Sequence, residues 1–321
     1  MLMNFLLLIA GFIILIFSAD KLVDGSSSLA RKFGIPDIVI GLTIVAFGTS
    51  APELFVNVIA AINGNTQLVL GNIIGSNIFN VLVILGVSSL IYPLSVKRNT
   101  TWLEIPLSLL AGLVVLFMSN DVFFDKAETN ILSRIDGIIL FCFFIIFHVY
   151  SMEVAKSGVS DEEFEAKDLT KLKSTIFILV GLAGLVIGGE LIVNSAVNIA
   201  NNIGISERMI ALTIVSIGTS LPELATSIVA VKKKNVDIAL GNIVGSNIYN
   251  IFFILGISAF ISPVNVEKSN STEIWINIFA NILLFIFIFS GKGRRIERWE
   301  GMTFLFLYLA YILVLILGVE L

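Results

Sequence analysis

Two segments of this chain recur at a constant offset of 170 residues. Residues 41–57 read GLTIVAFGTSAPELFVN and residues 211–227 read ALTIVSIGTSLPELATS, with ten of 17 positions identical. Residues 70–86 read LGNIIGSNIFNVLVILG and residues 240–256 read LGNIVGSNIYNIFFILG, with twelve of 17 positions identical. Because self-similarity of this kind reflects a repeated structural unit, any fold of this chain has to build one unit twice.

The chain is also far more apolar than a soluble domain. Hydrophobic residues make up 57% and charged residues 14%, against roughly 45–50% and about 25% in soluble proteins. A bilayer core about 30 Å thick is crossed by about 20 apolar residues in a helix. This predicts an all-α integral membrane protein with ten transmembrane helices. The expected spans are 3–19, 38–62, 68–93, 101–119, 134–151, 174–197, 208–231, 238–262, 272–290 and 299–319.

The spans divide into two halves of five. We expect a first five-helix repeat at 1–151, a cytoplasmic linker at 152–173 and a second repeat at 174–321. Since five is odd, the second half must enter the membrane inverted relative to the first. Inverted repeats are a recurrent transporter architecture, with broken helices and the substrate site near the bilayer midplane.

The positive charges indicate the orientation. Of the 20 lysines and arginines, 16 fall in the five odd-numbered loops and four on the other side. Positive residues concentrate on the cytoplasmic side. We therefore expect both termini to be extracytoplasmic and the protein to lie in the cell membrane.

The GTSxPE motif predicts a broken helix. Pro52 has no backbone N–H, so the carbonyl of Gly48 loses its helical partner, and glycine weakens the helix at the same point. The break is expected near 46–52, with carbonyls around Ala46–Gly48 available as ligands. The second copy repeats this pattern around Ser216, Gly218 and Pro222.

Each broken helix carries an acid. Thr49, Glu53 and Asn57 follow at four-residue spacing and share one helical face, and the second copy places Glu223 in the same position. A carboxylate near the bilayer centre costs several kcal/mol, so such residues are functional by default. The alternative is a buried carboxylate satisfied by hydroxyls or held protonated. Two symmetric acids without a lysine or arginine deep in a span favour a transported cation as the partner.

The second motif, GNxxGSNxxN, adds a polar stripe. Asn72, Ser76 and Asn80 recur at four-residue spacing beside a face of small residues that allows close helix packing. For Asn72 and its copy Asn242, interhelical hydrogen bonding and ion ligation are equally supported. The remaining members are expected to line an ion site; they are Ser76, Asn80, Ser246 and Asn250.

The candidate ligands are all oxygen atoms, from carboxylate, hydroxyl, amide and backbone carbonyl groups. Oxygen ligands suit hard cations such as Ca2+ and Na+, whereas zinc and copper prefer nitrogen or sulfur. We expect these ions to be transported substrates, with no cofactor. Asp20, Asp24 and Glu190 fall where the first helix of each half should end, and we expect them to be solvated, with a gating role as the alternative.

The two motifs, GTSAPE with GNIIGSNIFN and GTSLPE with GNIVGSNIYN, resemble the alpha-repeats of the sodium/calcium exchanger family, within the cation/calcium antiporter superfamily. The resemblance extends along the chain, because ten spans in two inverted halves is also the family's plan. It implies a minimal prokaryotic type without a large regulatory domain. It implies Ca2+ ligands at Glu53, Glu223, Thr49 and Thr219, and Na+ contacts from Ser50, Ser76, Ser220, Ser246 and the carbonyls of Ala46 and Ser216.

One position departs from the family pattern. Many relatives carry Asp where this chain has Asn250, and Asp there is associated with K+ dependence, so K+ co-transport is disfavoured. The main alternative is a proton/Ca2+ antiporter, because two buried glutamates could carry protons. A cation channel fits inverted repeats less well. No HExxH motif, Ser–His pairing or nucleotide-binding loop supports an enzyme. We expect a bilayer-embedded protein that binds no nucleic acid and needs only a monomer for transport.

Overall fold

The computed structural model describes residues 2–156, 167–202, 216–290 and 293–317. The described residues contain eight helices long and apolar enough to cross a membrane, or nine if one bent pair counts as a single span. The all-α membrane class is thereby confirmed. The expected span 208–231 begins outside the described residues, so the count of ten stays a prediction.

The chain forms two compact units. Unit 1 comprises Met1–Pro52 and Ser151–Asn242, and unit 2 comprises Glu53–Tyr150 and Ile243–Leu321. Each unit therefore combines segments from both sequence halves. Two of the three boundaries fall inside the repeated motifs, after Pro52 in GTSAPE and after Asn242 in GNIVGSN, and the third follows Tyr150.

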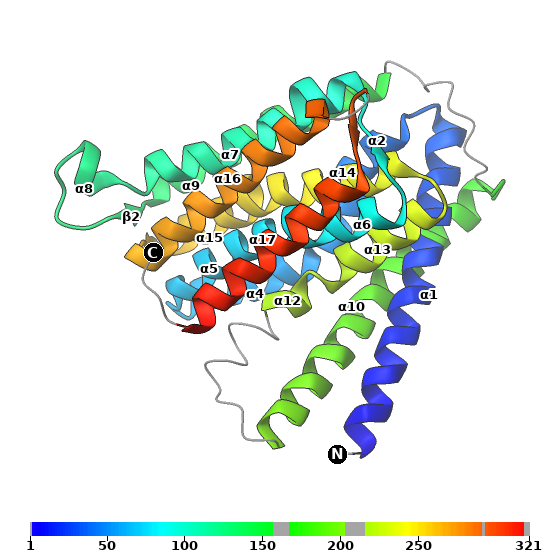
Figure 1. The fold of residues 1–321 in the computed structure, drawn as a ribbon, viewed down its shortest axis with the longest axis horizontal. Helices are drawn as coiled ribbons and strands as arrows, with labels where there is room; N and C mark the ends of the chain where they lie inside the picture. The colour runs from blue at the N-terminus through cyan, green and yellow to red at the C-terminus, as the bar shows by residue number, and fades with distance from the viewer. Residues whose placement is uncertain (1, 157–166, 203–215, 291–292, 318–321) are drawn as a thin grey trace. The chain divides into compact units, whose positions relative to one another are not determined.

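In unit 1, two long helices lie side by side along their length (Figure 1). They are α1 and α10, and both extend beyond the expected spans 3–19 and 174–197 because their polar ends also remain helical. The other elements here are short or reach the unit boundary. The elements are α1 (Leu2–Phe33), α2 (Asp37–Ile40), η1 (Gly41–Val45, a π-helix), α3 (Ala46–Thr49), α10 (Lys171–Asn202), α12 (Ser216–Thr219), α13 (Leu221–Lys232) and most of α14 (Val236–Ile248).

Small residues bring α1 and α10 together. A Cβ atom added at Gly11 would lie 3.0 Å from the carbonyl oxygen of Gly188, and one at Gly181 would lie 2.9 Å from the carbonyl oxygen of Ser18. Only small side chains permit this approach. With the offset of 170, Gly11 corresponds to Gly181 and Ser18 to Gly188, so the two contacts exchange with each other.

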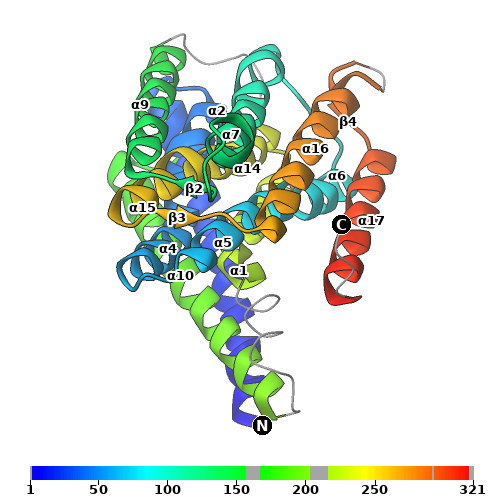
Figure 2. The ribbon, with the colours of Figure 1, turned by 90° about the vertical axis from the view of Figure 1, so that its left-hand side faces the viewer.

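Unit 2 contains the remaining helices and two pairs of short strands. Strands β2 and β3 lie together in Figure 2. The elements are α4 (Ala51–Ile62, from Glu53), α5 (Thr66–Phe79), η2 (Asn80–Ile84), α6 (Leu85–Ile91), β1 (Leu94–Ser95), η3 (Thr100–Glu104), α7 (Ile105–Met118), α8 (Asp121–Phe124), β2 (Ile131–Leu132), α9 (Arg134–Lys156, to Tyr150), η5 (Tyr249–Leu255), α15 (Gly256–Ile261), β3 (Val264–Asn265), α16 (Lys268–Ser290), β4 (Arg295–Ile296) and α17 (Arg298–Leu317).

The strand pairs of unit 2 also exchange between the halves. Leu94 pairs with Ile296, and Val264 pairs with Leu132. Leu94 and Val264 are 170 residues apart, whereas Leu132 and Ile296 are 164 apart, because the second half is six residues shorter before this point. When residue i contacts j and the copies contact in the exchanged order, the relation is that of a two-fold axis.

Candidate cation site

Both GTSxPE motifs break their helix at one serine. Helix α3 ends at Thr49 and α4 starts at Ala51, and the two stretches of this span are bent by 48°. In the second copy, Ser220 separates α12 from α13. Ser50 and Ser220 share similar backbone angles, with φ of −83° and −90° and ψ of 6° and 5°. The predicted break near 46–52 is confirmed, and its cause is the proline two residues after the serine.

The break leaves the carbonyl of Ala46 less available than the sequence indicates. This oxygen accepts the backbone N–H of Ser50 at 3.0 Å and lies 3.3 Å from the hydroxyl oxygen of Thr49. The helix therefore closes its last turn normally before it stops. A cation contact at Ala46 would have to use the second lone pair of the same oxygen.

Within unit 1, residues of the two repeats meet directly. The hydroxyl of Ser50 donates to Oε1 of Glu223 at 2.9 Å. The hydroxyl of Thr49 lies 2.9 Å from Oδ1 of Asn242, whose Nδ2 is 3.2 Å from the carbonyl of Glu223 and 3.0 Å from Oγ of Ser227. Since both ends of the Asn242 amide are engaged, the interhelical reading of this residue is favoured over ligation.

Unit 2 holds the other acid of the pair. Glu53 is 1% exposed, and its carbonyl accepts Nδ2 of Asn57 at 2.7 Å. Ser76 and Ser246 are 1% and 0% exposed. Glu53 lies in α4, Ser76 in α5 and Ser246 in α14.

Four asparagines form a hydrogen-bonded cluster in unit 2, which we call the asparagine cluster: Asn77, Asn80, Asn247 and Asn250. Nδ2 of Asn80 donates to Oδ1 of Asn247 at 3.0 Å, and Nδ2 of Asn250 donates to Oδ1 of Asn77 at 3.0 Å. The two bonds exchange under the offset of 170. Asn80 and Asn250 were expected at the site, but Asn77 and Asn247 were not. Their presence three residues earlier in both copies was the available signal.

Some of the predicted ligands lie in helices of unit 1 and the others in helices of unit 2. Every one whose side chain is described is buried. Unit 1 holds Ala46, Thr49, Ser50, Thr219, Ser220 and Glu223, with Ser216 opening α12; unit 2 holds Glu53, Ser76, Asn80, Ser246 and Asn250.

The buried acids differ from those of an ordinary ion-pair network in having no buried basic residue, in the part of the chain that the structure describes, to balance their charge. Among the described residues no lysine or arginine is buried, whereas Glu53 and Glu223 are each 1% exposed. In the same part of the chain, no three His, Cys, Asp or Glu side chains cluster to hold a metal. A cation at these positions would rely on hydroxyl, amide and carbonyl oxygens in addition to carboxylate, a set that suits hard ions.

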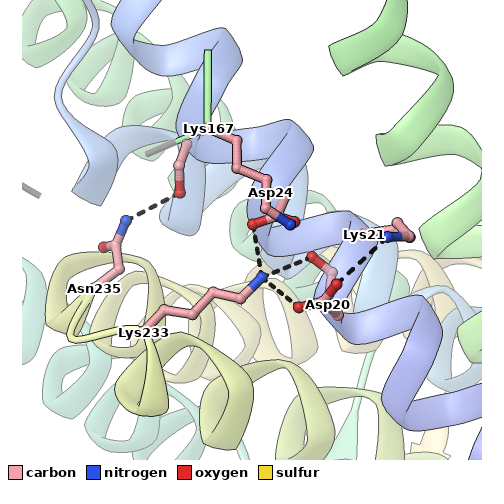
Figure 3. A network of polar contacts seen from close by, with 7 residues as sticks. Asp20, Lys21, Asp24, Lys167, Lys233 and Asn235 are labelled. Atoms are coloured by element: carbon pink, nitrogen blue, oxygen red, sulfur yellow. Dashed lines mark hydrogen bonds and ion pairs between the residues drawn. The ribbon is translucent and has the colours of Figure 1, made fainter. Parts of the chain in front are cut away.

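A second charged region lies in unit 1, which we call the lysine network: Asp20, Lys21, Asp24, Lys167 and Lys233 (Figure 3). The ammonium of Lys233 lies 2.5 Å from Asp20 and 2.7 Å from Asp24, and that of Lys167 lies 2.7 Å from Asp24. The expectation that Asp24 is solvated is wrong, because α1 continues past it and Asp24 is only 6% exposed. Glu190 is exposed, as expected.

The chain is similar in sequence and in structure to several known proteins. The family model described as sodium/calcium exchanger protein matches residues 3–153 and 173–317. The chain is 37% identical to the putative antiporter CaxA of Alkalimonas amylolytica over 97% of this chain and 98% of that protein. It is 32% identical to the sodium/calcium exchanger MaX1 of Methanosarcina acetivorans, covering 97% and 98%. The solved sodium–calcium exchanger NCX_Mj, soaked with Na+ and Sr2+, matches with a TM-score of 0.84 and 30% identity, covering 97% and 98%.

Proposed function

This chain belongs to the sodium/calcium exchanger family of membrane antiporters, and from that premise we propose that it exchanges Ca2+ for Na+ by alternating access, with net movement of charge. The observation that carries the proposal is the pair of buried acids, Glu53 and Glu223, in a part of the chain without a buried lysine or arginine. The proposed ligands are those two acids with Thr49, Thr219, Ser50, Ser220, Ser76, Ser246, Asn80, Asn250 and the carbonyls of Ala46 and Ser216.

Electrostatics explains exchange instead of leak. With both acids ionised, Glu53 and Glu223 together carry about two buried negative charges when no ion is bound, and occluding them costs several kcal/mol per uncompensated ion. One Ca2+ or two Na+ ions cancel that charge, so the loaded forms rearrange more readily than the unloaded form. The duplicated hydroxyl and carbonyl groups offer places for a third Na+. Exchange of three Na+ for one Ca2+ moves one net positive charge with Na+.

The proposed architecture is ten transmembrane helices in two inverted repeats, at 1–151 and 174–321. The exchanged contacts support it, since Gly11–Gly188 and Gly181–Ser18 in unit 1, and the strand pairs in unit 2, follow the rule of a two-fold axis. A monomer then contains both halves that alternating access requires.

The proposed orientation places both termini outside the cell. Cysteine labelling tests it in a variant whose only native cysteine is replaced, Cys142→Ser. Asn63 and Lys232 are exposed in the structure. A cysteine at Asn63 should react with an impermeant reagent from outside and one at Lys232 only from inside. The reverse pattern contradicts the span order.

Flux into proteoliposomes distinguishes the coupling ions. Vesicles loaded with Na+ should take up Ca2+ on dilution into Na+-free medium, and an inside-positive voltage clamped with K+ and valinomycin should speed uptake. Uptake that ignores voltage rules out the three-to-one ratio. Uptake driven by a pH gradient and not by Na+ replaces this proposal with a proton/Ca2+ antiporter. A requirement for K+ on the Ca2+ side, at clamped voltage, would identify K+ co-transport.

A further inference from the structure

A backbone carbonyl fixes the amide orientation of one member of the asparagine cluster, Asn77. Nδ2 of Asn77 lies 3.2 Å from the carbonyl oxygen of Asn247. A carbonyl only accepts hydrogen bonds, so the atom of Asn77 that faces it must be the NH2 group. The other terminal atom of Asn77 is then an oxygen, and it can receive only the NH2 group of Asn250, 3.0 Å away.

In this set of hydrogen bonds, two amide oxygens have no donor. Oδ1 of Asn250 is buried and has no hydrogen-bond donor among the described residues, and the same holds for Oδ1 of Asn80. Asn80 and Asn250 are 1% and 0% exposed. The NH2 groups of Asn80 and Asn250 thus donate within the cluster, while their amide oxygens accept no hydrogen bond from the described residues. A free acceptor can bind a cation, whereas a free NH2 group would repel one.

We propose that Asn77 and Asn247 are positioning residues for cation binding: they hold the Asn80 and Asn250 amides with their oxygens, and not their nitrogens, presented to the ion. In this proposal neither residue acts as a ligand: the amide oxygens of Asn77 and Asn247 each accept an NH2 group of the cluster, and the Asn77 nitrogen donates to a backbone carbonyl. The inference rests on the proposed role of Asn80 and Asn250 as ligands. The Asn80–Asn247 bond is the exchanged counterpart of the Asn250–Asn77 bond, whereas the backbone contact that fixes an amide orientation is the one made by Asn77.

A double-mutant cycle on the intact protein tests this dependence. The variants are Asn77→Leu, Asn250→Ala and the double mutant, with Ca2+ binding measured by titration calorimetry in detergent. Leucine keeps the branched shape of asparagine, although it is larger, and removes both bonds, so Asn250 can rotate. Asn77→Leu should weaken Ca2+ binding about tenfold, or about 1.4 kcal/mol. If Asn77 acts through Asn250, the double mutant should bind no more weakly than Asn250→Ala alone.

A matched control separates positioning from folding. Asn281 in α16 is also buried, with Nδ2 donating to the Asn277 carbonyl at 2.9 Å and Oδ1 accepting Ser108 at 3.0 Å. Asn281→Leu should lower the melting temperature with little change in Ca2+ affinity.

Two results would overturn the inference. One is full additivity of Asn77→Leu and Asn250→Ala. The other is a fall in melting temperature for Asn77→Leu, matching that of Asn281→Leu, with unchanged affinity. Na+ coupling is tested separately by flux measurements on the wild type. The double-mutant cycle on Ca2+ binding can therefore be interpreted even if the proposed exchange of Ca2+ for Na+ is wrong.

Discussion

The lysine network and the asparagine cluster differ in whether a buried oxygen atom has a partner within the protein. Asp24 is 6% exposed and is held by Lys233 and Lys167, so its charge is balanced by the chain itself. Asn250 is 0% exposed and neutral, and its oxygen has no donor among the described residues. A resident lysine stabilises an acid but occupies it permanently. Oxygen atoms that must bind and release an ion have to be left without such a partner.

Asn242 and Asn250 show that the same type of side chain can have a structural role or a proposed ligand role. Asn242 uses both ends of its amide to join Thr49, Glu223 and Ser227 within unit 1. Asn250 uses only its donor end, in unit 2. The hydrogen-bond inventory of each amide, and not its residue type, separates a structural role from a proposed ligand.

The largest expected effect is on the acids. Glu53→Gln and Glu223→Gln should each reduce Ca2+ exchange about 100-fold or more, since loss of a charged interaction of about 3 kcal/mol corresponds to two factors of ten. Glutamine keeps the shape, so the protein should still insert and purify. Measured Ca2+ flux in proteoliposomes near the wild-type rate would remove that acid from the proposed ligands.

A charge placed in the asparagine cluster should cost the next largest amount. In Asn250→Asp the donor to Asn77 is lost, and two acceptor oxygens face each other across the former 3.0 Å hydrogen bond. The expected loss of stability is about 1–3 kcal/mol in ion-free buffer. Added Ca2+ should restore much of the melting temperature.

Asn281→Asp provides the comparison for that variant, because it also places a carboxylate at a buried asparagine of unit 2. Ca2+ should not rescue it beyond the shift seen for the wild type. Equal rescue of both variants would show that Ca2+ stabilises the fold generally and not through Asn250.

Breaking the lysine network should affect stability and not ion affinity. Lys233→Met leaves Asp20 and Asp24 with weaker compensation, and because the lysine side chain is 23% exposed the expected loss is about 1–3 kcal/mol. The exposed neighbour Lys232→Met is the control. Ca2+ binding within about twofold of wild type is expected, and a large loss would mean that the network contributes to ion binding.

The smallest effect is expected at Lys167, whose side chain is 59% exposed. The hydrogen bond from Lys167 to Asp24 raises the pKa of the lysine. A raised lysine pKa stabilises the fold fully below the ordinary value near 10.4, and the contribution is lost as pH rises through the higher folded value. Lys167→Met should cost about 0.5 kcal/mol at neutral pH, and the difference from wild type should disappear in strongly alkaline buffer.

The membrane class, the two copies of each motif, and the helix breaks before Pro52 and Pro222 could all be predicted from the amino-acid sequence. These features depend on local chemistry: apolar length, residue identity at a fixed offset, and a missing backbone N–H. The sequence also identified Glu53, Glu223, Asn80 and Asn250 as candidate ligands, because polar residues are costly within apolar spans.

Which of these polar groups already have a hydrogen-bond or ion-pair partner depends on the packing of the helices and could not be predicted. The tertiary structure pairs Ser50 with Glu223, closes the carbonyl of Ala46, buries Asp24 against lysines distant in sequence, and recruits Asn77 and Asn247 to orient two amides. Sequence spacing gives the face of a helix on which a side chain lies, but it does not give the partner on another helix. Hydrogen bonding depends on contacts of about 3 Å between segments some 170 residues apart, and packing alone brings those segments together.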